Sequence, residues 1–354
     1  MSHDLFSFAI DPREISEAVD AARSDVRYVV TDFPVELLVS RFREEAEEEG
    51  EIYIPSYQRA LAWSEEHGSY LIESLLLKIP IPPIFLYDVK GKLEIVDGSQ
   101  RIRSLVNFFN DKFSLDGLEK LEILNGLYFK DLPLEVQRRL RNTPIRSFVI
   151  EEGTDASMRV ELFRRLNTSG KKLQDAEIRK GAFRGKFLDL VVLCSESEVF
   201  KSLTQHLGGK ADPKSERQEL VTRFFIYSNG YKDFKHDVRK FLDGWMVKYN
   251  KSLSDKDIDN MMKEFDKSMR FISDNFPKAF YRMATGKRVP RVRFEAVAVG
   301  VNLALREKPG LRIRGAPWLS SDIFKELVRT DASNSGPKLR ARIEYVRDQL
   351  LEKA

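Results

Sequence analysis

The polar run Asp97-Gly98-Ser99-Gln100-Arg101 is the part of this sequence best suited to chemistry. It follows the strand-like residues LEIV and precedes an apolar helical pattern, so it predicts a turn from a strand into a helix. The first amides of a helix lack intrahelical partners and lie at the positive end of the helix dipole. Gly98 permits close approach of a ligand, and Arg101 adds a forked cation for phosphate oxygens. The run therefore indicates an anion site, in which Asp97 holds Mg²⁺ or orients a water molecule.

A purely structural turn fits the same residues. In that interpretation Asp97 or Ser99 caps the helix and Arg101 pairs with an acidic neighbour. The residues of the turn leave both interpretations open.

Histidine and cysteine are too scarce and too scattered for several common kinds of active site. The four histidines lie far from one another and from the single cysteine, Cys194. This pattern excludes a disulfide within the chain and argues against a zinc site or a histidine-based nucleophilic triad. Any chemistry is expected to use carboxylates, arginines and backbone amides.

The composition is that of a soluble globular protein, with 42% hydrophobic and 32% charged residues among 354. No apolar run approaches the ~20 residues of a membrane span. The first residues lack the basic start and apolar core of a secretory signal. A single cysteine in an apolar stretch favours a reducing compartment. We therefore expect a cytoplasmic protein with no membrane partner.

Charge divides the chain unevenly. Residues 1–209 carry 28 basic and 35 acidic side chains, a net charge of −7, whereas residues 210–354 carry 31 and 20, a net charge of +11. A basic half is a candidate surface for nucleic acid. Ordinary solvated helices in a slightly basic protein explain the same excess.

Periodicity predicts an α+β N-terminal domain followed by a mostly helical one. In the first part we expect helices at 34–49, 69–78, 99–109, 132–142, 158–167 and 173–183. Strands are expected at 51–55, 79–89, 92–96 and 145–153. Beyond residue 185 the expected elements are all helices, at 217–228, 233–249, 255–275, 294–306, 320–330 and 337–352.

Four sequence blocks occur in order along the first part: YQRALAW (57–63), IPIPPIFLY (79–87), EIVDGSQRIRSL (94–105) and LFRRLNTSGKKLQDAEIRKGAF (162–183). Together they resemble the N-terminal domain family of GmrSD-type restriction endonucleases. That family is similar to the ParB/sulfiredoxin superfamily and carries a DGQQR motif. The resemblance implies a nucleotide-binding or nucleotide-hydrolysing pocket, usually in anti-phage restriction proteins. It predicts an N-terminal extension at 1–30, a ParB-like nucleotide-binding domain at 31–190 and a helical, basic domain at 191–354.

The resemblance assigns roles within the polar run. Asp97, Gly98, Gln100 and Arg101 match the motif, and Ser99 replaces its first glutamine. Sulfiredoxins have a cysteine at that place, so Ser99 argues against their chemistry, although a serine hydroxyl can bond phosphate or hydrated Mg²⁺. Asp97, Gln100 and Arg101 are the expected catalytic residues, with Asp97 as the metal ligand.

Further residues are assigned to the nucleotide. The expected nucleotide-binding residues are Tyr57, Gln58, Arg59, Gly98, Ser99 and Asn167. Arg59 would add a second phosphate contact, and Tyr57 or Trp63 would stack on a base. Plain core packing is the alternative for Trp63, and a helix cap is the alternative for the turn that holds Asn167.

A basic stretch at 286–315 is the candidate site for double-stranded DNA. Its proposed contacts to the phosphate backbone are Lys287, Arg288, Arg291, Arg293, Arg312 and Arg314. The alternative is a solvated charged face. Residues 210–354 show no histidine-metal (HNH-type) nuclease pattern, so DNA cleavage would fall to a separate nuclease subunit.

The leading hypothesis is that the protein regulates a restriction-type system and binds a nucleoside triphosphate with Mg²⁺. An extension of this hypothesis is that it also hydrolyses the nucleotide. It would act with DNA or with a nuclease partner. The alternative is a non-catalytic DNA- or protein-binding module whose anion pocket is vestigial.

Overall fold

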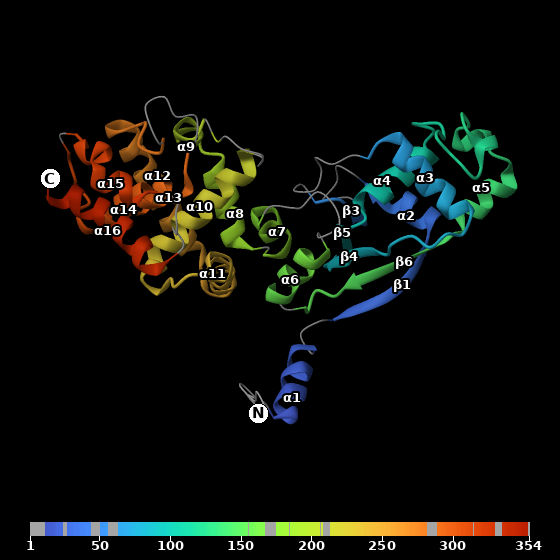
Figure 1. Cartoon of the computed structure of the whole chain (residues 1–354), viewed down its shortest axis with the longest axis horizontal. Coiled ribbons are helices and arrows are strands. Elements are labelled where there is room, and N and C mark those ends of the chain that lie inside the picture. Colours follow the sequence, from blue (N-terminus) through green and yellow to red (C-terminus); the bar gives the residue numbers. More distant parts are fainter. Residues whose placement is uncertain are drawn as a thin grey trace, which may run out of the picture. The chain divides into compact units, whose positions relative to one another are not determined.

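The computed structural model describes residues 11–23, 27–43, 50–55, 63–154, 156–166, 175–183, 185–205, 207, 213–281, 289–313, 315–329 and 335–352. The chain forms two compact units, Met1–Lys172 and Leu173–Ala354 (Figure 1).

The first unit is built on a six-stranded mixed sheet. Its strands lie in the order β1 (Tyr28–Pro34), β6 (Pro144–Ile150), β4 (Ile84–Val89), β5 (Lys92–Asp97), β3 (Ile52–Tyr53) and β2 (Phe42–Arg43). The β1–β6 and β4–β5 pairs are antiparallel. The β6–β4, β5–β3 and β3–β2 pairs are parallel.

Helices cover one face of this sheet and form the core with it. They are α2 (Val35–Arg41), α3 (Glu65–Leu76), α4 (Ser99–Phe109) and α5 (Leu134–Arg141) (Figure 1). In α4 the residues Ile102, Leu105 and Phe108 recur at helical spacing, are fully buried, and belong to the same cluster as Ile84 and Ile95 of the sheet. This packing fixes the start of α4 against the end of β5.

Smaller elements complete the first unit. These are the helices α1 (Pro12–Arg23) and α6 (Ala156–Leu166) and the 3₁₀ helices η2 (Glu122–Leu124) and η3 (Phe129–Asp131).

The structure corrects the sequence prediction at both ends of α2. Strand β1 was not predicted, and because it begins at Tyr28 the expected extension at 1–30 reaches into the sheet. The helix expected at 34–49 ends at Arg41, because Phe42 is buried, has an extended backbone and pairs with Ile52.

The described residues of the second unit form helices joined by loops, with no strand among them. Its α-helices are α7 (Asp175–Ala182), α8 (Lys186–Ser195), α9 (Glu198–Leu203), α10 (Pro213–Gly230), α11 (Val238–Ser252), α12 (Asp255–Asn275), α13 (Arg291–Phe294), α14 (Gly300–Glu307), α15 (Asp322–Leu327) and α16 (Gly336–Glu352). Between α13 and α14 lies a π-helix, η5 (Glu295–Val299), and short 3₁₀ helices occur at η4 (Tyr231–Asp233) and η6 (Pro317–Ser320). The predicted class, α+β followed by helices, is confirmed, although α8 and α9 were not predicted.

The division between the units lies at Lys172/Leu173, before the expected boundary at 190. Helices α7 and α8 pack on α10, and the fully buried Phe183 and Phe187 join the helical core. Hydrophobic burial therefore assigns both helices to the second unit. The charge asymmetry follows the structural division, since residues 1–172 carry −7 and residues 173–354 carry +11. No helix in the described part of the chain is long and apolar enough to cross a membrane.

Candidate functional site

The predicted strand-to-helix turn is formed as expected. Strand β5 ends at Asp97, Gly98 has a left-handed backbone with φ of 96°, and α4 begins at Ser99. A Cβ atom on residue 98 would lie 3.1 Å from the Arg101 Nη2 and 3.1 Å from the Ile84 Cγ1. Glycine is therefore favoured here both by backbone conformation and by space.

The start of α4 has no side-chain cap. The N-cap residue is Gly98, and neither Asp97 nor Ser99 makes the capping bond of the structural interpretation. The backbone amides of the first turn consequently keep the polarity that suits an anion.

Arg101 connects the turn to the proline-rich segment that precedes β4. Its Nη2 donates to the Asp97 Oδ2 at 2.7 Å, and its Nη1 donates to the carbonyl oxygens of Pro82 and, at 3.1 Å, Pro83. The side chain is buried, and desolvation lowers the pKa of Arg101 although Asp97 opposes this shift. The Arg101 guanidinium therefore holds the proline-rich segment and Asp97 in place, and its predicted contact to phosphate stays a prediction.

Gln100 and Trp63 form a second link. The backbone N–H of Trp63 donates to the Gln100 Oε1 at 3.0 Å. The Trp63 side chain is 43% exposed, so the core-packing alternative for this residue is wrong. Trp63 is thus joined to the turn through its backbone, and its indole ring lies 6.0 Å from the His67 ring.

Residues 39–184 match the family model described as the GmrSD restriction endonuclease N-terminal domain. This segment carries a GmrSD N-terminal domain. The match includes the sheet from β2 to β6, the Asp97–Arg101 turn and, beyond the division between the units, helix α7.

The comparison with solved structures finds a chain titled "Structure of the C2221 form of Pnob8-like ParB-N domain". The alignment covers 93% of this chain and 98% of that chain, with 14% sequence identity and a TM-score of 0.23. At this TM-score the alignment carries no argument about the fold or the function of this chain. No curated protein matches the chain.

In the GmrSD domain, Asp97 is the one carboxylate of the turn. Its side chain is 39% exposed, and its Oδ2 accepts from Arg101. The described residues contain no group of three or more histidine, cysteine or acidic side chains placed to hold a metal. Mg²⁺ commonly binds through one or two carboxylates together with substrate phosphates, so Asp97 fits an ion carried by a nucleotide.

Four expected nucleotide ligands lie outside the described residues: Tyr57, Gln58, Arg59 and Asn167. Ser99 is half-buried in the first turn of α4.

Sequence reasoning missed a buried polar cluster on β5 of the GmrSD domain. Glu94 is fully buried and accepts a hydrogen bond from the Tyr53 phenol at 3.1 Å. Tyr87 lies opposite Glu94 in the β4–β5 register, and Arg159 of α6 lies over the Tyr87 ring at 4.9 Å and donates to its phenol. The sequence contained one indication of this cluster, the charged residue Glu94 between the apolar residues Leu93 and Ile95.

Arg293 of the basic stretch at 286–315 was expected to contact DNA, but the structure places it inside the second unit. Arg293 is buried, donates from Nε to the Ala279 carbonyl at 2.6 Å and lies 4.8 Å over the Phe324 ring. Burial lowers the pKa of Arg293 to about 10. The prediction that Arg293 contacts DNA is therefore wrong, because its guanidinium stabilises the helical core.

Arg291 is neutralised by an acidic partner. Its Nε and Nη2 donate to the two Glu216 oxygens at 2.7 and 2.6 Å, the bidentate geometry that a phosphate would otherwise take. Arg312 is exposed, whereas Lys287, Arg288 and Arg314 lie outside the described residues. Of the predicted DNA contacts that the structure describes, Arg293 is buried, Arg291 is paired with Glu216 and Arg312 is exposed.

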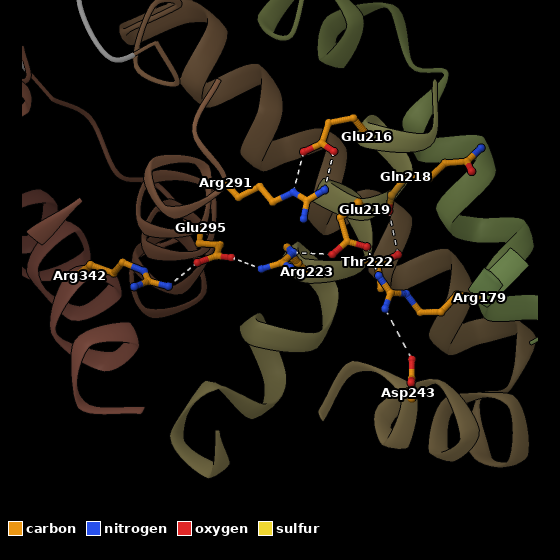
Figure 2. Close-up of polar contacts among 10 residues, drawn as sticks. All are labelled: Arg179, Glu216, Gln218, Glu219, Thr222, Arg223, Asp243, Arg291, Glu295 and Arg342. Carbon is orange, nitrogen blue, oxygen red and sulfur yellow. Dashed lines mark hydrogen bonds and ion pairs between the residues drawn. The ribbon is translucent and has the colours of Figure 1, made fainter. Parts of the chain in front are cut away.

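A buried network of ion pairs extends through the second unit (Figure 2). Glu219 of α10 accepts from Arg179 of α7 and, at 2.7 Å, from Arg223. Arg223 also donates to Glu295 of η5 at 2.6 Å, and Glu295 accepts from Arg342 of α16. The network connects four elements through residues that are at most 8% exposed.

The charges within this network compensate one another. Burial by itself would raise the pKa of Glu219, but Arg179 and Arg223 outweigh it and hold the pKa well below the usual range. Glu219 is therefore ionised at neutral pH, and its arginine partners are engaged with carboxylates. The network fits a structural role better than an anion site.

Proposed function

We propose that the GmrSD domain binds a nucleoside triphosphate at the start of α4, and that the chain is a nucleotide-dependent regulator of a restriction-type anti-phage system. One observation carries this proposal: the N-cap of α4 is Gly98, so the helix starts without a side-chain cap, beside the partly exposed carboxylate of Asp97. A helix start of this kind supplies oriented N–H groups and positive potential for phosphate oxygens.

The residues around the turn have distinct proposed roles. The amides of the first turn and the Ser99 hydroxyl would hold phosphate oxygens, and Asp97 would hold Mg²⁺ together with those oxygens. Trp63, which is exposed beside Gln100, would stack on the base. Arg101 would act as a positioning residue for Asp97.

We further propose that the domain hydrolyses the bound nucleotide. Asp97 or Gln100 would orient the attacking water, and the developing charge on the phosphoryl oxygens would be met by the helix amides and by Arg59. Tyr57, Gln58 and Asn167 would complete the nucleotide site.

The proposed partners are supported by the family match. The chain would act in the cytoplasm on double-stranded DNA or with a separate nuclease subunit, as a restriction-system domain suggests. Within the basic unit, Arg312 is exposed and, with Lys287, Arg288 and Arg314, is the proposed phosphate-backbone contact.

A thermal-shift screen of nucleoside triphosphates with and without Mg²⁺, combined with a phosphate-release assay, tests the proposal. A ligand at 100 times its Kd stabilises the folded state by about 2.7 kcal/mol, enough to raise the melting temperature measurably. Asp97→Asn should retain part of this shift and lose phosphate release at least about tenfold. Glu135→Gln removes a carboxylate that is 82% exposed and should behave as wild type.

The alternative function is a non-catalytic DNA- or protein-binding module with a vestigial anion pocket. The pairing of Asp97 with Arg101 favours it, because the two charges neutralise each other. Salt-sensitive DNA binding without a nucleotide-induced shift would support this alternative and refute nucleotide binding.

A further inference from the structure

Strand β1 is an open edge of the sheet in the first unit. It pairs with β6 along its whole length, from Tyr28 opposite Ile150 to Pro34 opposite Pro144, and no described strand lies on its other side (Figure 1). The other edge of the sheet, β2, is only two residues long. Short edge strands resist pairing with other chains, whereas long ones invite it.

The hydrogen-bond pattern identifies which groups of β1 point outward. The Glu151 N–H donates to the Arg27 carbonyl at 3.0 Å, and the Val35 N–H donates to the Thr143 carbonyl at 3.0 Å. In an antiparallel ladder, pairs that exchange hydrogen bonds alternate with pairs that do not. The backbone N–H and C=O groups of the odd-numbered residues between these two ends are therefore directed towards β6. The N–H and C=O groups of Tyr28, Val30 and Asp32 therefore point away from the sheet.

The side chains of β1 are those of a contact surface. Tyr28, Val29 and Val30 are 53%, 49% and 47% exposed. Tyr28 also continues a row of rings across the sheet, because it lies 5.6 Å from Phe148, which stacks on Phe85 at 5.0 Å. The strand has no lysine and no bulge, two of the features that usually protect an edge.

We propose that β1 is the contact strand of a two-fold dimer of this chain, in which two copies of β1 pair antiparallel about Val30. In this register Val30 faces Val30 of the second copy, and Tyr28 faces Asp32. Every outward N–H then meets an outward C=O, because the pattern of the strand is symmetric about Val30.

Side-chain chemistry favours a second copy over an unrelated strand. Tyr28, Val30 and Asp32 share one face of β1, so each phenol would lie opposite the carboxylate of Asp32 in the other copy. That carboxylate is already held by Arg146, whose Nε and Nη2 donate to it at 3.0 and 3.1 Å. Each aromatic ring would thus meet an ordered ion pair, and the two valines would exclude water at the axis.

Light scattering and sedimentation of the full chain test the proposal. The wild type should be a dimer, and Val30→Pro should reduce the mass roughly twofold, since proline removes an outward N–H but none of the bonds to β6. Val30→Thr retains the N–H and the branched side chain, so it should remain a dimer. A monomeric wild type, or a Val30→Pro variant that is folded and still dimeric, would overturn the proposal.

Disulfide formation tests the register even if Val30→Pro does not fold. Residue 29 of one copy would face residue 31 of the other in a non-hydrogen-bonded pair, with Cα atoms about 4.5 Å apart, within the reach of a disulfide. A mixture of Val29→Cys and Thr31→Cys chains should therefore cross-link under mild oxidation, whereas each variant alone should not. Cys194 is buried and is present in every sample as a constant background. Cross-linking that is equal in all three samples, or absent from the mixture, would refute the register.

Discussion

Replacing Arg101 with alanine should destabilise the first unit, in addition to any effect on nucleotide binding. Arg101 is 7% exposed as a residue, and its guanidinium bonds two prolyl carbonyls and Asp97. A hydrogen bond from a charged donor contributes about 1.5–3 kcal/mol. The Asp97 carboxylate is 39% exposed and adds little, because solvent screens the pair. We therefore expect a loss of about 2–4 kcal/mol, which for a unit of this size lowers the melting temperature by roughly 5–15 °C.

Hydrogen exchange measured by mass spectrometry is the appropriate assay, because it reports on each unit of the chain separately. Peptides from β5 and α4 should lose protection in Arg101→Ala, and peptides from the second unit should not change. Arg101→Lys should recover part of the loss, since an ammonium group can reach one acceptor but lacks the planar fork. Arg139→Ala is a matched control: that side chain is 57% exposed and pairs with an exposed Glu135, so the expected change is within about 0.5 kcal/mol.

The reasoning is refuted if Arg101→Ala matches Arg139→Ala in exchange and in melting temperature. If nucleotide binding were lost at the same time, Arg101 would be a direct phosphate ligand.

Four further substitutions have expected outcomes. Glu219→Gln should lower the free energy of unfolding of the second unit by about 3–5 kcal/mol at neutral pH, because it removes the buried carboxylate that Arg179 and Arg223 share. Since the folded pKa of Glu219 is lowered, its stabilisation is present above the ordinary glutamate pKa of about 4.3 and is lost as pH falls below it, so denaturation from pH 7 to 3 should show a shallower acid dependence in the variant. Gly98→Ala should destabilise the first unit in thermal melts by about 1–3 kcal/mol, because a left-handed backbone and 3.1 Å contacts both oppose a Cβ atom. Trp63→Ala should reduce the nucleotide-induced thermal shift and leave the unliganded melting temperature unchanged, as expected for an exposed ring. Arg293→Ala should lower the melting temperature of the second unit and leave the salt dependence of any DNA binding unchanged, because the guanidinium is buried.

Local sequence patterns determined the turn at the centre of the candidate site. The short apolar run of β5, the glycine at position 98 and the helical spacing of Ile102, Leu105 and Phe108 each indicate the same strand-to-helix transition. Such signals act between residues that are neighbours along the chain, so they can be interpreted without the fold. The four sequence blocks that resemble the GmrSD family are also local patterns. The family match over residues 39–184 confirms that resemblance.

Longer-range contacts decided what the charged residues do. Nothing in the sequence near Arg101 indicates that its guanidinium is directed to the carbonyls of Pro82 and Pro83. Likewise Arg293 resembled a free cation of a basic loop, but the packing of Phe324 and the Ala279 carbonyl buries it. A guanidinium is long and can be satisfied by any nearby acceptor, so its partner depends on which elements the fold brings within reach.

The sequence alone therefore determined the class of each half of the chain, the Asp97–Arg101 turn and the family of residues 39–184. The tertiary structure alone decided that β1 is an edge of the described sheet, that the units divide at Lys172, and that Arg179, Arg223 and Arg342 are engaged in a buried network. Periodicity and turn residues are encoded locally, whereas strand pairing and the partners of buried charges depend on residues brought together from distant parts of the chain.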